Sequence, residues 1–516
     1  MTPVQRMPRP FVHAPGQFDG AFWVEEQIWG HRFYDEQTPW LTFLEFMAVF
    51  QHDASLNAAP DLKYKPQRQL RLRNIVFNNP HFPELQRDPP LPDAEAWKRW
   101  LALMQRGVSQ TDPAGLAELQ GRIPEFQDFA RLVGYLQRTA IEGNSNKRWS
   151  SKFVFPFGPT ALYEDLRVND GGASNDRRFF ARSGELLYMM LARAKAAPDL
   201  APLLKARFLE EGSSTDAVLK VLQGVNEPAP DYKPVGYLPY ATLDEYDVLA
   251  EDWLFLLSQK LPQFDVLPHL VSMTGLHLLI YFLRRAVAEV GDAPVTFVCE
   301  IVSPRKTAVR DVALRSFERN QALPRVAVEA LLMGVRSTPE WQHAISDPEP
   351  LLAAAAVLDS KFDWPQEDDL KSLSVTTPEG LLKELVDKAL TRHKQHVGKI
   401  HGSWARFIGL SSRRASQRVR YAPTDSLLKA LVFANVSQRM EYKEFLRRLY
   451  DRYGIVIGEG QAQSFIESEE ADLEDFAENA ARLEERLTSL GLMHRLSDGC
   501  AYVQLPFAAR GGKIDG

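Results

Sequence analysis

The stretch EYKEFLRRLYDRYG, residues 441–454, decides the fold class because its apolar side chains recur at helical spacing. Apolar positions three and four residues apart lie on one face of an α-helix, and a glycine directly after the last of them commonly ends the helix. The spacing therefore predicts an amphipathic helix that ends at Gly454. Its predicted buried face consists of Tyr442, Phe445, Leu446, Leu449, Tyr450 and Tyr453.

Two further helices and a hairpin surround this stretch. Residues 423–436 begin with a Thr-Asp cap, and residues 471–491 repeat the amphipathic pattern and end at a glycine. Residues 492–507 contain two apolar runs joined by the dipeptide DG, which favours a tight hairpin turn. Three helices followed by a hairpin are the layout of a winged helix. The sequence predicts a multidomain, mainly α fold with small β elements (α+β) and a C-terminal winged-helix-like module.

Earlier parts of the chain mix helical and strand patterns. Residues 71–79 and 151–159 are predicted to form short strands between helical segments, and residues 295–302 a strand in the mostly helical middle part. Residues 177–197 have helical spacing, with Leu186, Met190 and Leu191 on one face.

The composition is that of an ordinary globular protein, 45% hydrophobic and 25% charged. With 61 Lys and Arg against 67 Asp and Glu, the chain cannot coat nucleic acid with its whole surface, but a local basic face is allowed. Only two cysteines are present, which excludes a disulfide framework and favours a reducing compartment. Residues 1–17 lack the apolar core of a signal peptide, and the apolar run at 270–283 is shorter than the ~20 residues that span a bilayer. We therefore expect a buried helix there, a cytoplasmic location and no membrane partner.

Two polar stretches that contain prolines predict domain boundaries. Residues 226–239 carry four prolines, and residues 363–380 are polar and interrupted by proline. We expect an aromatic-rich mixed domain at 1–225 and a helical middle domain with one or few strands at 226–375. The basic segment and the winged-helix-like domain would then occupy 376–516.

The sequence contains none of the common catalytic motifs. The P-loop, HExxH, paired CxxC, GxSxG and GxGxxG patterns are absent. One nuclease arrangement places a metal-binding glutamate on a strand with a lysine two residues later. Glu300 lies in the predicted strand at 295–302, but residue 302 is a valine, so an ion pair between Glu300 and a nearby arginine is favoured. The chain is predicted not to be an enzyme, with no catalytic residue, no cofactor and no metal.

Four of the eleven histidines lie in the basic part of the chain or in an apolar run. His393, His396 and His401 have no cysteine or carboxylate near them in sequence, so we expect them to be solvated or to face phosphate rather than to bind a metal. His277 lies within an apolar run and is expected to be a core histidine with a hydrogen-bond partner.

Residues 388–420 form a basic stretch in an acidic chain, with nine Lys or Arg, three His and no Asp or Glu. Arginines beside serine hydroxyls are well suited to phosphate oxygens, which accept charge-assisted hydrogen bonds. Seven residues are predicted to bind nucleic acid: Lys394, Lys399, Arg406, Arg413, Arg414, Arg418 and Arg420. The alternative is that this stretch pairs with an acidic partner or with the chain's own acidic residues at 467–485.

The third predicted helix of the C-terminal module, at 471–491, is acidic. The third helix of a winged helix usually enters the major groove, but phosphates would repel this one. Either the preceding basic stretch makes the contact, or the module docks another protein.

Three stretches carry a resemblance to a known family: FWVEEQIWGHRFYDEQTPWLTFLEF at 22–46, RRFFARSGELLYMMLARA at 177–194, and YAPTDSLLKALVFANV with MEYKEFLRRLYDRYGIVIG within 421–458. Together they resemble accessory proteins of bacterial anti-phage defence islands. The nearest resemblance is to the accessory subunit of methylation-associated defence systems, and a looser one is to the DptG-type component of phosphorothioation-dependent restriction. The resemblance implies a non-catalytic subunit beside an ATPase, a methyltransferase or a nuclease, and it supplies no catalytic residues.

The expected function is therefore that of a non-catalytic subunit in a restriction-type anti-phage defence complex. Such a subunit would contact DNA and dock an ATPase or effector subunit of the same system. Two alternatives remain open, a divergent metal-dependent nuclease and a pure protein scaffold that makes no DNA contact.

Overall fold

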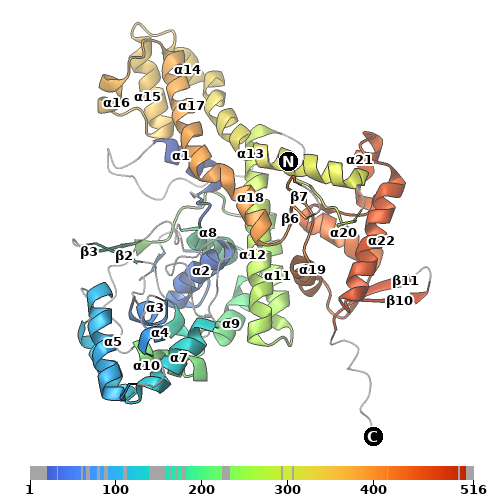
Figure 1. The fold of residues 1–516 in the computed structure, drawn as a ribbon. Helices are drawn as coiled ribbons and strands as arrows, with labels where there is room; N and C mark the ends of the chain where they lie inside the picture. The colour runs from blue at the N-terminus through green and yellow to red at the C-terminus, as the bar shows by residue number, and fades with distance from the viewer. Residues whose placement is uncertain are drawn as a thin grey trace. The chain divides into compact units, whose positions relative to one another are not determined.

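The computed structural model in Figure 1 describes residues 20–506 apart from internal gaps. The gaps are residues 32, 60–61, 65–69, 78, 80–81, 86–90, 109–112, 139–157, 163–165, 170–171, 176–181, 224–232, 292–293, 305–306, 415–416 and 498–499. The fold is mainly helical with small sheets, which confirms the predicted fold class at this level.

The chain forms two compact units that are interleaved along the sequence. Unit 1 consists of Met1–Asp35, Arg193–Ala196 and Tyr237–Gly516, and unit 2 of Glu36–Ala192 and Ala197–Gly236. This division differs from three consecutive domains at 1–225, 226–375 and 376–516. The proline-rich stretch at 226–239 does lie where the chain passes from unit 2 into unit 1. Residue 375, in contrast, lies inside unit 1, because helices on both sides of it pack together.

Two long helices form the centre of unit 1. α12, Gln263–Val290, packs against α13, Ala308–Met333, and against α11, Asp244–Ser258. Among the described helices, α12 is the one that is long and apolar enough to cross a membrane, with mean hydropathy 1.6, and 83% of that window is buried inside the protein. The apolar run at 270–283 is thus part of a buried core helix, as predicted.

The N-terminal helix α1, Gly20–Trp29, is fixed to this centre by aromatic side chains. The indole of Trp29 donates a hydrogen bond to the Phe282 carbonyl at 2.9 Å, and the Tyr281 hydroxyl donates to the Trp29 carbonyl at 3.0 Å. α1 also packs against α17, Pro378–Gln395. These contacts explain why the first part of the chain belongs to unit 1.

Shorter helices and small sheets complete unit 1. The helices are η3 Gly334–Ser337, α14 Pro339–Ala344, α15 Pro350–Phe362, α16 Glu367–Ser372, α18 Val397–Phe407, α19 Asp425–Asn435, α20 Tyr442–Tyr453, η4 Glu459–Gln461, α21 Gln463–Glu467 and α22 Leu473–Ser489. The strands are β5 Phe297–Val298, β6 Ser411–Ser412, β7 Arg420–Tyr421, β8 Arg439–Glu441, β9 Ile455–Val456, β10 Met493–Ser497 and β11 Cys500–Gln504. β5 pairs with β9 in parallel, β6 with β7 antiparallel, and β10, β11 and β8 form an antiparallel sheet in that order.

The helices predicted for the C-terminal part are present as α19, α20 and α22, and the predicted hairpin is β10–β11. Gly454 ends α20 with φ +71°, and a Cβ there would lie 2.6 Å from the Val295 carbonyl, so a glycine is required. One residue of the predicted buried face differs, because Tyr450 is 39% exposed.

Unit 2 is also mainly helical. Its elements are α2 Pro39–Asp53, β1 Lys63–Tyr64, α3 Leu70–Phe77, α4 Phe82–Leu85, α5 Asp93–Val108, α6 Pro113–Arg122, α7 Phe126–Arg138, η2 Pro159–Ala161, β2 Leu166–Asn169, β3 Gly172–Asn175, α8 Ser183–Ala192, α9 Ala197–Phe208, α10 Ser214–Gln223 and β4 Lys233–Pro234. The strand predicted at 71–79 is wrong, because Leu72, Ile75 and Val76 are one buried face of helix α3. The helix predicted within 177–197 is confirmed as α8. Residues 151–157 of the strand predicted at 151–159 lie outside the described residues.

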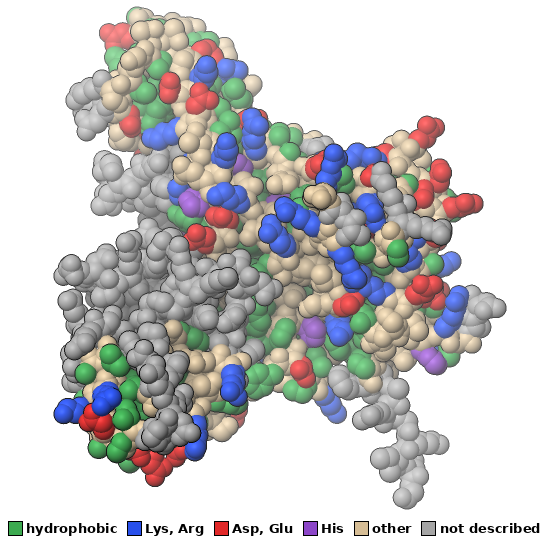
Figure 2. Space-filling model, viewed as in Figure 1, with side chains coloured by type: hydrophobic (Ala, Val, Ile, Leu, Met, Phe, Trp, Pro, Cys, Tyr) green, Lys and Arg blue, Asp and Glu red, His purple; other side chains and the backbone are tan. Residues whose placement is uncertain are grey.

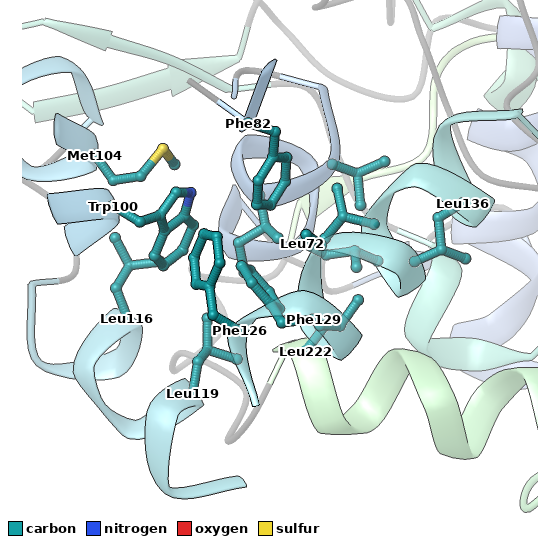
Figure 3. Close-up of a cluster of buried hydrophobic side chains, with 14 of the residues drawn as sticks. Leu72, Phe82, Trp100, Met104, Leu116, Leu119, Phe126, Phe129, Leu136 and Leu222 are labelled. Carbon is teal, nitrogen blue, oxygen red and sulfur yellow. The ribbon is translucent and has the colours of Figure 1, made fainter. Parts of the chain in front are cut away.

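Aromatic side chains form much of a core in unit 2, shown in Figure 3. Trp100 and Phe129 meet edge to face with ring centroids 4.9 Å apart, and Phe82 lies beside both of them. The side chains come from α3–α7 and α10, so this core holds six helices together.

Candidate nucleic-acid interface

The second half of the basic stretch forms a small hairpin in unit 1. α18 ends at Phe407, β6 and β7 pair antiparallel, and residues 413–419 connect them. Arg413 and Arg414 at the start of the connection and Arg418 near its end are exposed. We call β6, β7 and the described residues of this connection, 413–414 and 417–419, the basic hairpin.

The base of the basic hairpin is fixed by a buried ion pair. The Arg420 side chain is 1% exposed, and its guanidinium Nε donates to Oε2 of Glu300, which is fully buried. Arg310 Nε donates to Oε1 of the same carboxylate at 2.9 Å. Arg420 Nη2 also donates to the Arg414 carbonyl at 2.9 Å, so one side chain links the base to the connection.

Two sequence predictions meet at this ion pair, and they have opposite outcomes. The expected pairing of Glu300 with a nearby arginine is confirmed, with two arginines. The prediction that Arg420 contacts phosphate is wrong, because its guanidinium is buried against the carboxylate of the chain itself. Arg420 therefore positions the basic hairpin and does not belong to its outer surface.

A hydrogen-bonded group of polar side chains lies next to the ion pair. The Tyr421 hydroxyl accepts a hydrogen bond from Asn320 Nδ2 at 2.9 Å and lies 2.6 Å from Nε2 of His401. Burial lowers the pKa of His401 to about 3, so the ring is neutral at physiological pH.

Exposed cations carry the predicted interface. Arg406 on α18 is exposed, like Arg413 and Arg414, and within the described part of the chain none of these three guanidinium groups pairs with a carboxylate. Lys394 on α17 is exposed as well. Their role in binding stays a prediction.

Lys399 has an intramolecular partner. Its amino group lies 3.8 Å from Asp35, which is also 3.1 Å from Nδ1 of His396. The amino group is largely exposed, so the ion pair is weak and a phosphate could compete for it.

Two of the three clustered histidines differ from expectation. His393 and His401 are buried, because α17 and α18 direct them into the core of unit 1, where His393 stacks on Trp29. His396 is partly buried and paired with Asp35. The prediction of solvated or phosphate-facing rings is thus wrong for His393 and His401. His277 is a core histidine as predicted, with Nε2 2.7 Å from Asp252.

Three of the nine Asp and Glu residues at 467–485 pair with arginines among the described residues. Glu470 pairs with Arg315 on α13 at 2.9 Å, Glu478 with Arg482 at 2.9 Å, and Glu484 lies 3.5 Å from Arg495. Each of these pairs uses an arginine outside the basic stretch.

The structure adds two cations that the sequence analysis did not select. Lys443 and Arg447 are exposed on one flank of α20, one helical turn apart, and no carboxylate among the described residues pairs with either. Their spacing of four residues was the available signal, and the surrounding acidic residues obscured it.

Figure 2 shows where these charges lie. On the face that it displays, Lys and Arg side chains gather over the part of unit 1 that contains β6, β7 and α20. Among the described residues, no group of three or more His, Cys, Asp or Glu side chains is arranged to hold a metal ion. The described geometry is therefore one of cations on a rigid base.

Comparison of the chain with family models, with curated proteins and with solved structures finds no match.

Proposed function

We propose that this chain is a non-catalytic, DNA-contacting subunit of a restriction-type anti-phage defence complex. The observation that carries the DNA contact is the basic hairpin, which presents Arg413, Arg414 and Arg418 on a base fixed by the buried pair of Arg420 and Glu300. The defence context is supported by the sequence resemblance alone. The cytoplasm is the compartment in which such a complex would meet phage DNA.

Phosphate is the ligand class that suits this arrangement. Arginine donates pairs of hydrogen bonds to phosphate oxygens, and a base that is already ordered reduces the entropy lost on binding. Each phosphate that is neutralised releases counterions, so binding should weaken as the salt concentration rises. A plot of log affinity against log salt concentration should have a slope near −0.9 for each phosphate contact on duplex DNA.

The C-terminal part is proposed to be a winged-helix-like module. Support comes from the order α19, β8, α20, α22, β10, β11, with β9, η4 and α21 inserted between α20 and α22, and from the antiparallel sheet in which β11 lies between β10 and β8. Its last helix, α22, exposes Glu474, Glu478 and Glu485, and Asp472 is exposed at the N-cap of this helix. In this proposal α22 faces a protein partner, such as an ATPase or effector subunit, and the basic hairpin faces DNA.

A salt titration of DNA binding tests the proposal. The variant Arg413→Ala/Arg414→Ala/Arg418→Ala should bind a 30-base-pair duplex more weakly, and its slope of log affinity against log salt should be smaller in magnitude by up to about 3. The control Arg99→Ala/Arg131→Ala/Arg325→Ala removes three exposed arginines that pair within their own helices, so the total charge change is matched.

The outcomes separate the three functions considered. An unchanged slope in the hairpin variant, or the same change in the control, would contradict a specific hairpin contact. Absence of salt-dependent binding by the wild type would favour the protein scaffold. Nicking of plasmid by the pure protein with Mg²⁺ or Mn²⁺ would favour the nuclease.

A further inference from the structure

An exposed tyrosine on α20 lies on the same flank as two exposed cations. Tyr450 is 39% exposed and follows Lys443 and Arg447 at seven and three residues, so the three side chains share one stripe of the helix. The buried stripe consists of Tyr442, Phe445, Leu446, Leu449 and Tyr453. A large aromatic ring left outside an otherwise regular apolar stripe is available to contact a ligand.

The other two arginines of α20 are used inside the protein. Arg448 Nη1 donates to the Asn435 carbonyl at 2.7 Å, and Arg452 Nη2 donates to the buried Asp252 at 2.5 Å. The Tyr453 hydroxyl donates to Asp252 at 2.7 Å. These contacts fix the orientation of the helix, so Lys443, Arg447 and Tyr450 stand on a rigid support.

Backbone pairing connects this support to the basic hairpin. Glu300 N donates to the Tyr421 carbonyl at 3.0 Å, and Cys299 N donates to the Val456 carbonyl at 2.9 Å. The segment that contains β5 therefore lies between β7 and β9. Neighbouring strands are about 5 Å apart, so the backbones of β7 and β9 are about 10 Å apart. Gly454, which precedes β9, donates to the Tyr450 carbonyl at 2.7 Å, so Tyr450 is one turn from this backbone.

We propose that this face of α20 binds an unpaired segment of DNA, with Lys443 and Arg447 on its phosphates and the Tyr450 ring stacked on a base. The inference rests on the proposed function, since the basic hairpin holds the adjoining DNA. Bases inside a duplex are already stacked, so a tyrosine ring adds a stacking partner only where a base is unpaired. Glu444 and Asp451 are exposed beside this face of α20. Their carboxylates would repel the phosphates of the second strand of a duplex.

The test compares a duplex with the same duplex carrying a ten-nucleotide single-stranded extension, by fluorescence anisotropy. Wild type should bind the extended DNA more tightly, and Tyr450→Ala should lower affinity for it roughly 5- to 150-fold, the range of one lost base stack. Affinity for the plain duplex should change less than about twofold. Tyr450→Phe retains the ring and should bind like wild type. The control Tyr135→Ala removes a tyrosine that is 61% exposed in unit 2 and should have no effect.

The results separate this inference from the proposed function. If the hairpin variant loses salt-dependent binding while Tyr450→Ala binds both DNAs like wild type, the inference is wrong and the proposed function stands. If Tyr450→Ala loses equal affinity for the plain and the extended duplex, the inference is also wrong. If wild type binds neither DNA, both proposals fail. Circular dichroism of Tyr450→Ala and Tyr450→Phe establishes that both variants are folded.

Discussion

Replacement of Glu300 by alanine is expected to lower the free energy of unfolding of unit 1 by about 3–5 kcal/mol. The carboxylate is fully buried and is shared by Arg420, which is 1% exposed, and by Arg310. Removing it takes away the carboxylate that pairs with the buried Arg420 guanidinium and with Arg310 Nε. The loss is measured by chemical denaturation followed by near-ultraviolet circular dichroism.

Two further variants make this result interpretable. Glu300→Leu/Arg420→Met removes both buried charges and should recover much of the loss, because apolar side chains can replace a buried ion pair at little cost. Glu470→Ala breaks the exposed pair with Arg315 and should cost at most about 1 kcal/mol. A Glu300→Ala protein within 1 kcal/mol of wild type would show that the buried pair does not hold the hairpin base.

Acidification from pH 8 to pH 5 is expected to remove about 4 kcal/mol of stability from unit 1 through two histidines. Burial lowers the pKa of His393 to about 4 and of His401 to about 3. In the unfolded chain both titrate near 6.5, so below that pH the unfolded state binds more protons than the folded state. Stability is therefore complete above pH 6.5 and falls as the pH drops toward 3 to 4, by about 2 kcal/mol per histidine at pH 5.

The variant His401→Gln isolates one of the two contributions. It should lose about 2 kcal/mol less than wild type between pH 8 and pH 5, whatever its stability at pH 8. His494→Gln, at an exposed position of β10, should behave like wild type. If the wild-type protein is equally stable at pH 8 and pH 5, the lowered pKa of both buried histidines is contradicted.

Local patterns in the sequence predicted local structure well. The spacing of Phe445 and Leu449 with Gly454 gave α20, and a cap at Thr424 gave the start of α19. The pattern failed where a short apolar segment fits both the helical and the strand period. Residues 71–79 resemble a strand, but α3 is a helix that packs against other helices in the core of unit 2. Tyr450 has the right spacing for burial and is still exposed, because the apolar stripe was already complete without it.

The parts of the site that depend on distant residues could not be predicted. Arg420 and Glu300 are 120 residues apart, and nothing in either segment indicates that they meet. The same reason explains the burial of His393, which stacks on Trp29 in the N-terminal helix. The exposed arginines of the hairpin were identifiable because a run without carboxylates is a local property of the sequence.

The interleaved order of the two units has a consequence for synthesis on the ribosome. α1 leaves the tunnel long before α17, on which it packs. At translation rates of about 5–20 residues per second, this delay is roughly 15–70 s. Its other partner helices, α12 and α13, also emerge late, after all of unit 2 has been synthesised. Nascent chains should therefore need protection of this aromatic segment, by a chaperone for example, until the later helices emerge.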